Sequence, residues 1–197
     1  MNKNDEVKIK EDIKDIYQFE ELKVLVKGFF LFDNDIKKLY DKIRSLHKDV
    51  YLVIVNANIV FGLDHIFGIM KIIIEEIKRE NKKDIKNFDI EFLLRICYTD
   101  QISYAFQMVN DNKDNNNFIC IIFSKCLTSI KNAYIDLKNY GKEDYIDTLI
   151  QVSKAKRFYI VKLFFDKNLK DLDDLYLLKD DCEFQKFLIE RSAIALK

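Results

Sequence analysis

The sequence predicts an α/β (α+β) fold, a single domain with one mixed β-sheet flanked by helices. Short runs of β-branched and aromatic residues alternate along the chain with segments whose apolar residues recur every three or four positions. Of the 197 residues, 49% are hydrophobic and 34% are charged, enough for both a core and a solvated surface. Because we find neither an internal repeat nor a shift in composition, we expect one domain.

The amino-terminal part should consist of a charged extension followed by the first strand. Residues 1–20 are dominated by Lys, Asp and Glu, which favours a frayed segment or a loosely held helix. The domain itself is therefore expected to cover residues 21–197. Residues 22–32 are rich in Val, Leu and Phe and predict a strand that is interrupted near Gly28.

Two helices and a buried strand should follow. Residues 36–46 carry apolar side chains at helical spacing after a cap formed by Asp33, Asn34 and Asp35. Residues 51–55 are mostly β-branched and predict a buried strand. Residues 63–79 form the most regular amphipathic pattern of the chain, with a second apolar face beside His65. That helix should be either covered on both faces within the domain or covered on one face by a partner.

The middle of the chain predicts two short helices and a strand. Asp89 is the expected N-cap of a helix carrying Ile90, Leu93, Leu94 and Cys97. Asp100 should open a second helix that reaches Val109. Residues 118–123 form the clearest strand pattern.

The last third of the chain should alternate in the same way. A helix over residues 127–140 ends at Gly141, and residues 145–152 resemble a strand. Ser153 can cap a helix that reaches Phe165. After an acidic, leucine-rich connection, a final helix begins at Asp181.

The charge composition excludes nucleic-acid binding by a bulk positive charge. The chain has 33 basic and 33 acidic residues, whereas domains of that class carry a large basic excess. Local patches stay open, such as the basic residues of 78–86 or of 154–157. Either patch could follow a tRNA backbone or form an ordinary solvated surface.

The reactive side chains do not form a recognisable catalytic, cofactor or metal motif. The four cysteines include no C-x-x-C pair, and the four glycines are isolated, so we expect no metal and no cofactor. The amino terminus has no signal peptide and no run is long enough to span a bilayer, which predicts a soluble, cytoplasmic protein without a membrane partner. An alternative is a small α/β enzyme or ligand-binding domain with a pocket near His65 and Cys97.

Three segments, taken in order, resemble a known family. The first is Val53-Ile54-Val55-Asn56-Ala57-Asn58-Ile59-Val60, followed by Gly62-Leu63-Asp64-His65 and the long apolar helix. The second is Glu91-Phe92-Leu93-Leu94-Arg95, followed by Gln101-Ile102 and Ala105-Phe106, and the third is Leu188-Ile189-Glu190-Arg191-Ser192-Ala193-Ile194-Ala195-Leu196. The series resembles the small kinase-binding subunit of the KEOPS complex, the TPRKB (PRPK-binding protein) family. The resemblance spans residues 22–197, although residues 127–180 match only in the order of strands and helices.

The resemblance implies a noncatalytic adaptor. Members of that family bind the small atypical kinase/ATPase of KEOPS and help to recruit tRNA, and archaeal members hold its 3′ CCA end. The complex places threonylcarbamoyl on the adenosine next to the anticodon, with the chemistry done by another subunit. A eukaryotic member would be nuclear as well as cytoplasmic. The oligomeric state of the chain outside the complex stays open.

The resemblance also carries candidate RNA-binding residues, namely Glu91, Arg95, Tyr98, Gln101 and His65. A guanidinium can pair with phosphate, a glutamine can read a base edge and a tyrosine can stack on a base. Glu91 and Arg95 are also spaced for an ion pair within one helix. The stretch Tyr98-Thr99-Asp100 departs from the family pattern, which often has a Gly and a basic residue there, and Asp100 would repel phosphate.

The C-terminal helix is the candidate kinase-facing surface. Its apolar residues extend around more of the helix than one core stripe requires, and they would need cover in a monomer. The residues expected to contact the kinase are Phe187, Leu188, Ile189, Ala193, Ile194 and Leu196. The alternative is that all of them pack on the domain's own sheet.

Overall fold

The structure is a computed structural model of the chain, and it describes residues 16–33, 35–80, 87–110, 116–165 and 180–195. The strands are β1 (Ile16–Phe19), β2 (Leu22–Leu31), β3 (Tyr51–Asn56), β4 (Asn117–Ser124) and β5 (Gly141–Asp144). The helices are α2 (Ile36–Leu46), α3 (Leu63–Arg79), α4 (Phe88–Ile96), α5 (Ile102–Asn110), α6 (Leu127–Leu137), α7 (Ile146–Leu149), α8 (Lys154–Phe165) and α9 (Asp181–Ile194). Two 3₁₀ turns, η1 (Ala57–Ile59) and η2 (Lys138–Tyr140), complete the described elements.

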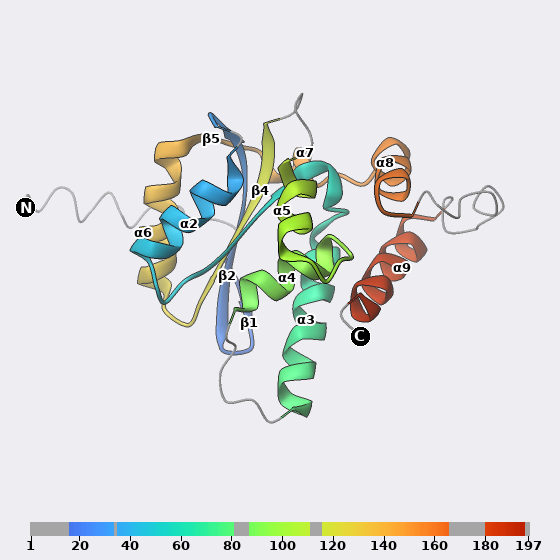
Figure 1. Cartoon of the computed structure of the whole chain (residues 1–197), viewed down its shortest axis with the longest axis horizontal. Coiled ribbons are helices and arrows are strands. Elements are labelled where there is room, and N and C mark those ends of the chain that lie inside the picture. The colour runs from blue at the N-terminus through green and yellow to red at the C-terminus, as the bar shows by residue number, and fades with distance from the viewer. Residues whose placement is uncertain (1–15, 34, 81–86, 111–115, 166–179, 196–197) are drawn as a thin grey trace, which may run out of the picture.

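The strands form one five-stranded sheet in the order β1-β2-β4-β3, with β5 also paired to β2 (Figure 1). Every pairing is antiparallel, whereas the sequence led us to expect a mixed sheet. Strand β2 pairs with β4 along one side, while β1 and β5 share its other side at opposite ends. The α/β class and the single sheet with flanking helices are confirmed.

Helices cover both faces of the sheet, which explains the continuous apolar run in β4. On one face, the Phe88 and Phe92 rings of α4 lie 5.2 and 5.7 Å from the Phe123 ring. On the other face, Tyr134 of α6 packs edge-on against Phe29 of β2, with ring centroids 6.2 Å apart. All residues of β4 from Phe118 to Ser124 are buried, as expected for a strand with no solvent-facing side.

The outer edge of β3 is closed by a buried carboxylate. Asp89 accepts hydrogen bonds from the Tyr40 hydroxyl at 3.0 Å and from the Leu52 backbone N–H at 3.5 Å, and it pairs with Arg44 at 2.9 Å. The expectation that Asp89 caps its own helix is therefore wrong. The helix begins at Phe88, with Asn87 in the cap position. Asp89 instead accepts a hydrogen bond from a backbone N–H of the edge strand β3.

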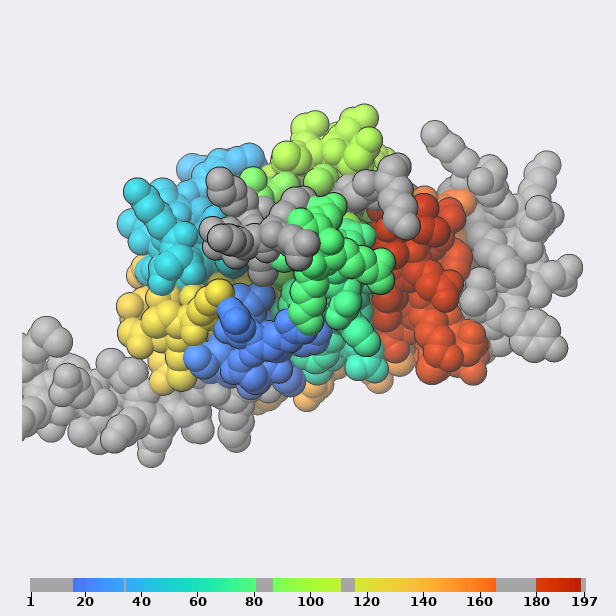
Figure 2. Space-filling view, turned by 90° about the horizontal axis from the view of Figure 1, so that it is seen from below, coloured from blue at the N-terminus to red at the C-terminus, as the bar shows by residue number. Residues whose placement is uncertain are grey.

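Helices α8 and α9 form an outer layer beyond α3. Helix α9 packs on the side of α3 that faces away from β1 and β2, so α3 lies between the amino-terminal strands and α9 (Figure 2). Phe61, Ile160, Val161, Phe184 and Leu188 form a second buried cluster at this junction. The second apolar face of α3 is thus covered within the chain, by α9.

Most helices expected from the sequence are confirmed, including α2 and the full extent of α3. Besides the expected Asp89 cap, three local expectations are wrong. Strand β2 runs through Gly28 without interruption, and there a Cβ would lie only 2.7 Å from Leu149 Cδ1. Residues 145–152 contain the short helix α7 rather than a strand, and the extended segment lies earlier, at β5. Gly141 is extended (φ −168°) and begins that strand rather than forming a left-handed helix end.

The described part of the expected N-terminal extension belongs to the domain, because Ile16–Phe19 pair with β2 as strand β1. Residues 1–15 lie outside the described residues, as do Leu196 and Lys197. None of the helices that the structure describes has the length and apolarity required to cross a membrane.

Candidate partner-binding surface around the C-terminal helix

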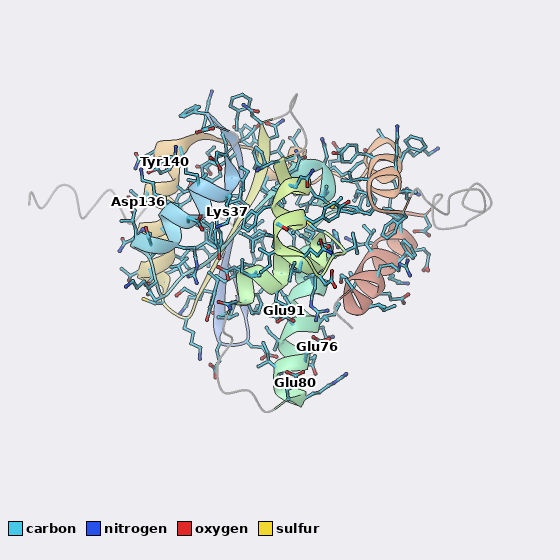
Figure 3. All side chains as sticks on the ribbon, in the orientation of Figure 1. Lys37, Glu76, Glu80, Glu91, Asp136 and Tyr140 are labelled. Carbon is cyan, nitrogen blue, oxygen red and sulfur yellow. The ribbon has the colours of Figure 1, made fainter. Side chains whose placement is uncertain are left out.

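Arg95 joins helices α3, α4 and α9 where they meet. Its guanidinium forms ion pairs with Glu76 of α3 and with Glu91 of α4, the latter at 3.0 Å. Nη1 donates a hydrogen bond of 2.9 Å to the backbone carbonyl of Ser192 in the last turn of α9. Figure 3 shows Glu76 and Glu91 close together where α3 and α4 meet. Arg95 therefore links the end of α9 to the inner helices.

The Arg95 guanidinium forms its hydrogen bonds and ion pairs with groups of its own domain. The Arg95 side chain is only 3% exposed, whereas the side chains of Glu76 and Glu91 are 34% and 32% exposed. A cation that contacts RNA phosphate must present its N–H groups to solvent, but those of Arg95 face two carboxylates and a carbonyl. The geometry thus favours the ion-pair interpretation of Glu91 and Arg95.

Close helix–helix packing holds the middle of α9. A Cβ at Gly68 of α3 would lie 2.4 Å from Ile189 Cδ1, so the absence of a side chain there admits Ile189. One turn earlier, the Phe184 ring lies edge-on to Phe61 with centroids 4.9 Å apart. The Gln185 amide donates to the Phe61 carbonyl at 3.0 Å. These contacts bring α9 onto the start of α3.

The residues expected to face the kinase differ in how much of them is accessible. Leu188 is fully buried within the domain, and Phe187, Ile189 and Ala193 are half-buried. Ile194 is 56% exposed, and Leu196 lies outside the described residues. Of the described members of this set, Ile194 is therefore the one whose side chain is mostly free for a partner.

The buried His65 of α3 contacts the half-buried Tyr98, which follows the end of α4. His65 Nδ1 accepts a 3.3 Å hydrogen bond from the Phe61 N–H, so its proton resides on Nε2, which lies 3.3 Å from the Tyr98 hydroxyl. Burial lowers the pKa of His65 to about 3 and raises the pKa of Tyr98 well above its usual range. Both side chains are neutral at physiological pH.

Tyr98 occupies a backbone position that usually belongs to glycine. Its φ of 51° lies in the left-handed region, one residue after Cys97, the C-cap of α4, where helices commonly have Gly. The Tyr98 ring packs against Phe164 and Phe165 with centroids 4.9 and 5.1 Å away. These contacts offset the backbone strain, and they direct the ring toward other residues of the domain.

Cys97 and His65 do not have the protonation states that a nucleophilic pair requires. Burial raises the pKa of Cys97 to about 12, and its thiol points to the Ala105 carbonyl, with Sγ 3.8 Å from the oxygen. A catalytic pair needs a thiolate beside a protonated imidazole. Burial disfavours both the Cys97 thiolate and the protonated His65 imidazole.

Gln101 is the most accessible of the candidate RNA-binding residues. It is exposed just before α5, where its backbone carbonyl accepts from the Ala105 N–H and its own N–H bonds the Thr99 hydroxyl at 3.2 Å. Its side-chain amide forms no hydrogen bond with any other residue that the structure describes. Glu91, by contrast, is already paired with Arg95.

Sequence reasoning missed the residues that complete this junction. Glu76 and the Ser192 carbonyl come from segments distant in sequence from Arg95, and no local pattern pairs them. Arg157 of α8, which pairs with Asp181 at the start of α9, was expected on an exposed basic patch but is buried. The close approach at Gly68 has one signal in the sequence, a glycine inside an otherwise strong helix pattern.

A separate cavity lies at the end of the sheet where β1 turns into β2. It has a volume of 450 Å³ and is bordered by the β1–β2 turn, the end of β4 and the second half of α3. Its rim carries both charge signs, including Glu21 and Lys125, which pair at 2.7 Å. Within the described part of the chain, no group of three or more His, Cys, Asp or Glu residues could hold a metal ion.

Comparison with known proteins assigns no family to this chain. No family model and no curated protein matches its sequence.

Proposed function

We propose that this chain is a noncatalytic accessory subunit of the KEOPS complex. It binds the small atypical kinase/ATPase and helps to recruit tRNA, through the 3′ CCA end, for threonylcarbamoyladenosine modification next to the anticodon. The support comes from the order and spacing of the three resembling segments. They include the start of α3, the α4–α5 region and α9, which pack against one another in the fold. Such a subunit would act in the cytoplasm, and in a eukaryote also in the nucleus.

The kinase contact is proposed for the C-terminal end of α9. The single observation that carries it is the exposed Ile194 on a helix that is otherwise anchored by Leu188 and Ile189. An anchored helix holds its backbone in place before binding, so little backbone entropy is lost when a partner covers the exposed side chain. Half-buried Ala193 is the neighbouring residue, and half-buried Phe187 lies two turns earlier on the same side of the helix.

Co-purification of the chain with the kinase tests this contact. We expect Ile194→Arg to abolish the complex without unfolding the domain, because the side chain is exposed. The matched control is Ile135→Arg on α6, whose isoleucine is 49% exposed on another part of the molecule (Figure 1). Unchanged kinase affinity of Ile194→Arg, or equal loss in both variants, would contradict the proposed contact. Ile189→Arg is unsuitable because it would also force α9 away from Gly68.

The tRNA contact is best tested at Gln101. Replacement of Arg95 would disturb the helix junction as well as any RNA contact, whereas Gln101 is exposed and its side chain is not needed to cap α5. We expect Gln101→Ala to weaken tRNA binding by the assembled complex, and a tRNA without its CCA end to bind less well. If the variant and the shortened tRNA both bind as the originals do, this chain does not hold the tRNA end.

A further inference from the structure

A second cavity lies on the side of the molecule where η1, β4, α7 and α8 converge. Its volume is 340 Å³, at the lower end of the range for pockets that hold small molecules. Six of its lining side chains are neutral hydrogen-bonding groups, and one is a cation. They are Asn58, Asn117, Thr148, Gln151, Ser153, Tyr159 and Lys156.

The lining contains no carboxylate among the residues that the structure describes, although the chain has 33 acidic residues. Two other cavities, at the end of the sheet and beside α2, differ in this respect. The one at the end of the sheet includes Glu20, Glu21 and Asp49, and the smaller one beside α2 includes Asp33 and Asp35. Of these three cavities, the one near Lys156 is therefore the one whose described lining favours a negatively charged ligand.

Lys156 is held at the wall of this cavity by the backbone. Its Nζ donates hydrogen bonds to the Val60 carbonyl at 3.1 Å and to the Leu149 carbonyl at 2.5 Å. An ammonium has three N–H donors, so one remains after these two bonds. Burial lowers the pKa of Lys156 to about 8, so the side chain is still mainly charged at neutral pH.

The ammonium is partly buried and forms no ion pair with any carboxylate in the described part of the chain. A buried charge is normally compensated by an opposite charge, and the two carbonyls supply only dipoles. The first turn of α8 adds to the positive potential, since Lys156 lies near the helix start that Ser153 caps through its 3.1 Å bond to the Lys156 N–H.

We propose that the cavity lined by Lys156 and these six neutral polar side chains binds a small oxyanion, a phosphate or carboxylate group of a small molecule. The third Nζ–H of Lys156 donates to the anion, and the amide and hydroxyl groups of Asn58, Thr148 and Gln151 surround it. This site is separate from the α9 surface and does not depend on the function proposed above.

The direct test is a titration of the whole chain with inorganic phosphate, followed by NMR. We expect saturable shifts confined to Lys156 and its cavity neighbours. The Lys156→Gln variant should weaken binding by about tenfold or more, because the charge-assisted hydrogen bond is lost. The matched control is Lys154→Gln, which removes the same charge from an exposed position two residues away and should change the affinity less than about twofold.

A second variant supplies the counter-charge from the protein itself. In Thr148→Asp, a carboxylate enters the cavity lining, pairs with Lys156 and excludes phosphate, so binding is lost while the melting temperature does not fall. The proposal is overturned if phosphate produces no saturable shift, if both lysine variants weaken binding equally, or if Thr148→Asp binds phosphate as well as the original chain does. Binding of tRNA but not of phosphate at Lys156 would also overturn it.

Discussion

Replacement of Arg95 should weaken the contact of α9 with α3 and α4. In Arg95→Met the apolar stem is largely retained, but all four hydrogen bonds of the guanidinium disappear. Hydrogen bonds to charged groups contribute about 1.5–3 kcal/mol each. Glu76 and Glu91 are about one-third exposed, so water recovers part of that energy when the arginine is removed. We expect a net loss of about 2–4 kcal/mol in the free energy of unfolding.

The assay is urea denaturation of the full chain combined with amide hydrogen exchange. A loss of that size should lower the urea midpoint by about 1–2 M at an m-value near 2 kcal/mol/M. Protection of the α9 amides should fall more than that of the β4 amides, because Arg95 bonds the Ser192 carbonyl. Arg95→Lys should recover only part of the loss, since an ammonium cannot reproduce the planar fork.

The matched control is Arg79→Met at the exposed end of α3. It should change the free energy of unfolding by less than about 0.5 kcal/mol. If Arg95→Met is no more destabilising than this control, the guanidinium does not hold the helices together. A uniform fall in amide protection over the whole chain would refute the specific link to α9.

Three further results are expected. Gly68→Ala should lower the free energy of unfolding by about 1–3 kcal/mol, because the new Cβ meets Ile189. Ile189→Ala should reduce that loss in the double variant. Additive losses in a double-mutant cycle measured by denaturation would disprove the contact. The pKa of His65 is about 3 when folded but about 6.5 when unfolded, so the unfolded state binds more protons between these values and stability falls as pH drops from 6.5, by up to about 1.4 kcal/mol per pH unit. His65→Asn should show a shallower fall from pH 7 to 4, and parallel curves would contradict the assignment. Hydrogen bonds from Ser129 lower the pKa of the exposed Cys126 thiol. Cys126 should therefore react with a disulfide reagent before the buried thiols do. Simultaneous reaction of all thiols in the native state would disprove this prediction.

Local patterns predicted much of the secondary structure because they report the environment of each segment. The spacing of apolar residues in α3 records that one side of the helix faces the core, and the helix begins and ends where predicted. The unbroken apolar run of β4 records burial on both sides. The sequence of residues 145–152 was misleading, because short apolar runs do not distinguish a strand from a helical turn.

The α/β class, the position of most helices and the apolar character of α9 could be predicted from local patterns, since all three depend on neighbours along the chain. The roles of Asp89 and Arg95 became visible only in the folded domain. Asp89 was expected to cap a helix but bonds an edge strand, and Arg95 was a candidate RNA ligand but bonds Glu76 and the end of α9. The partners of a polar side chain come from segments that folding brings together. Their identity depends on long-range packing, which the spacing of residues in one segment does not encode.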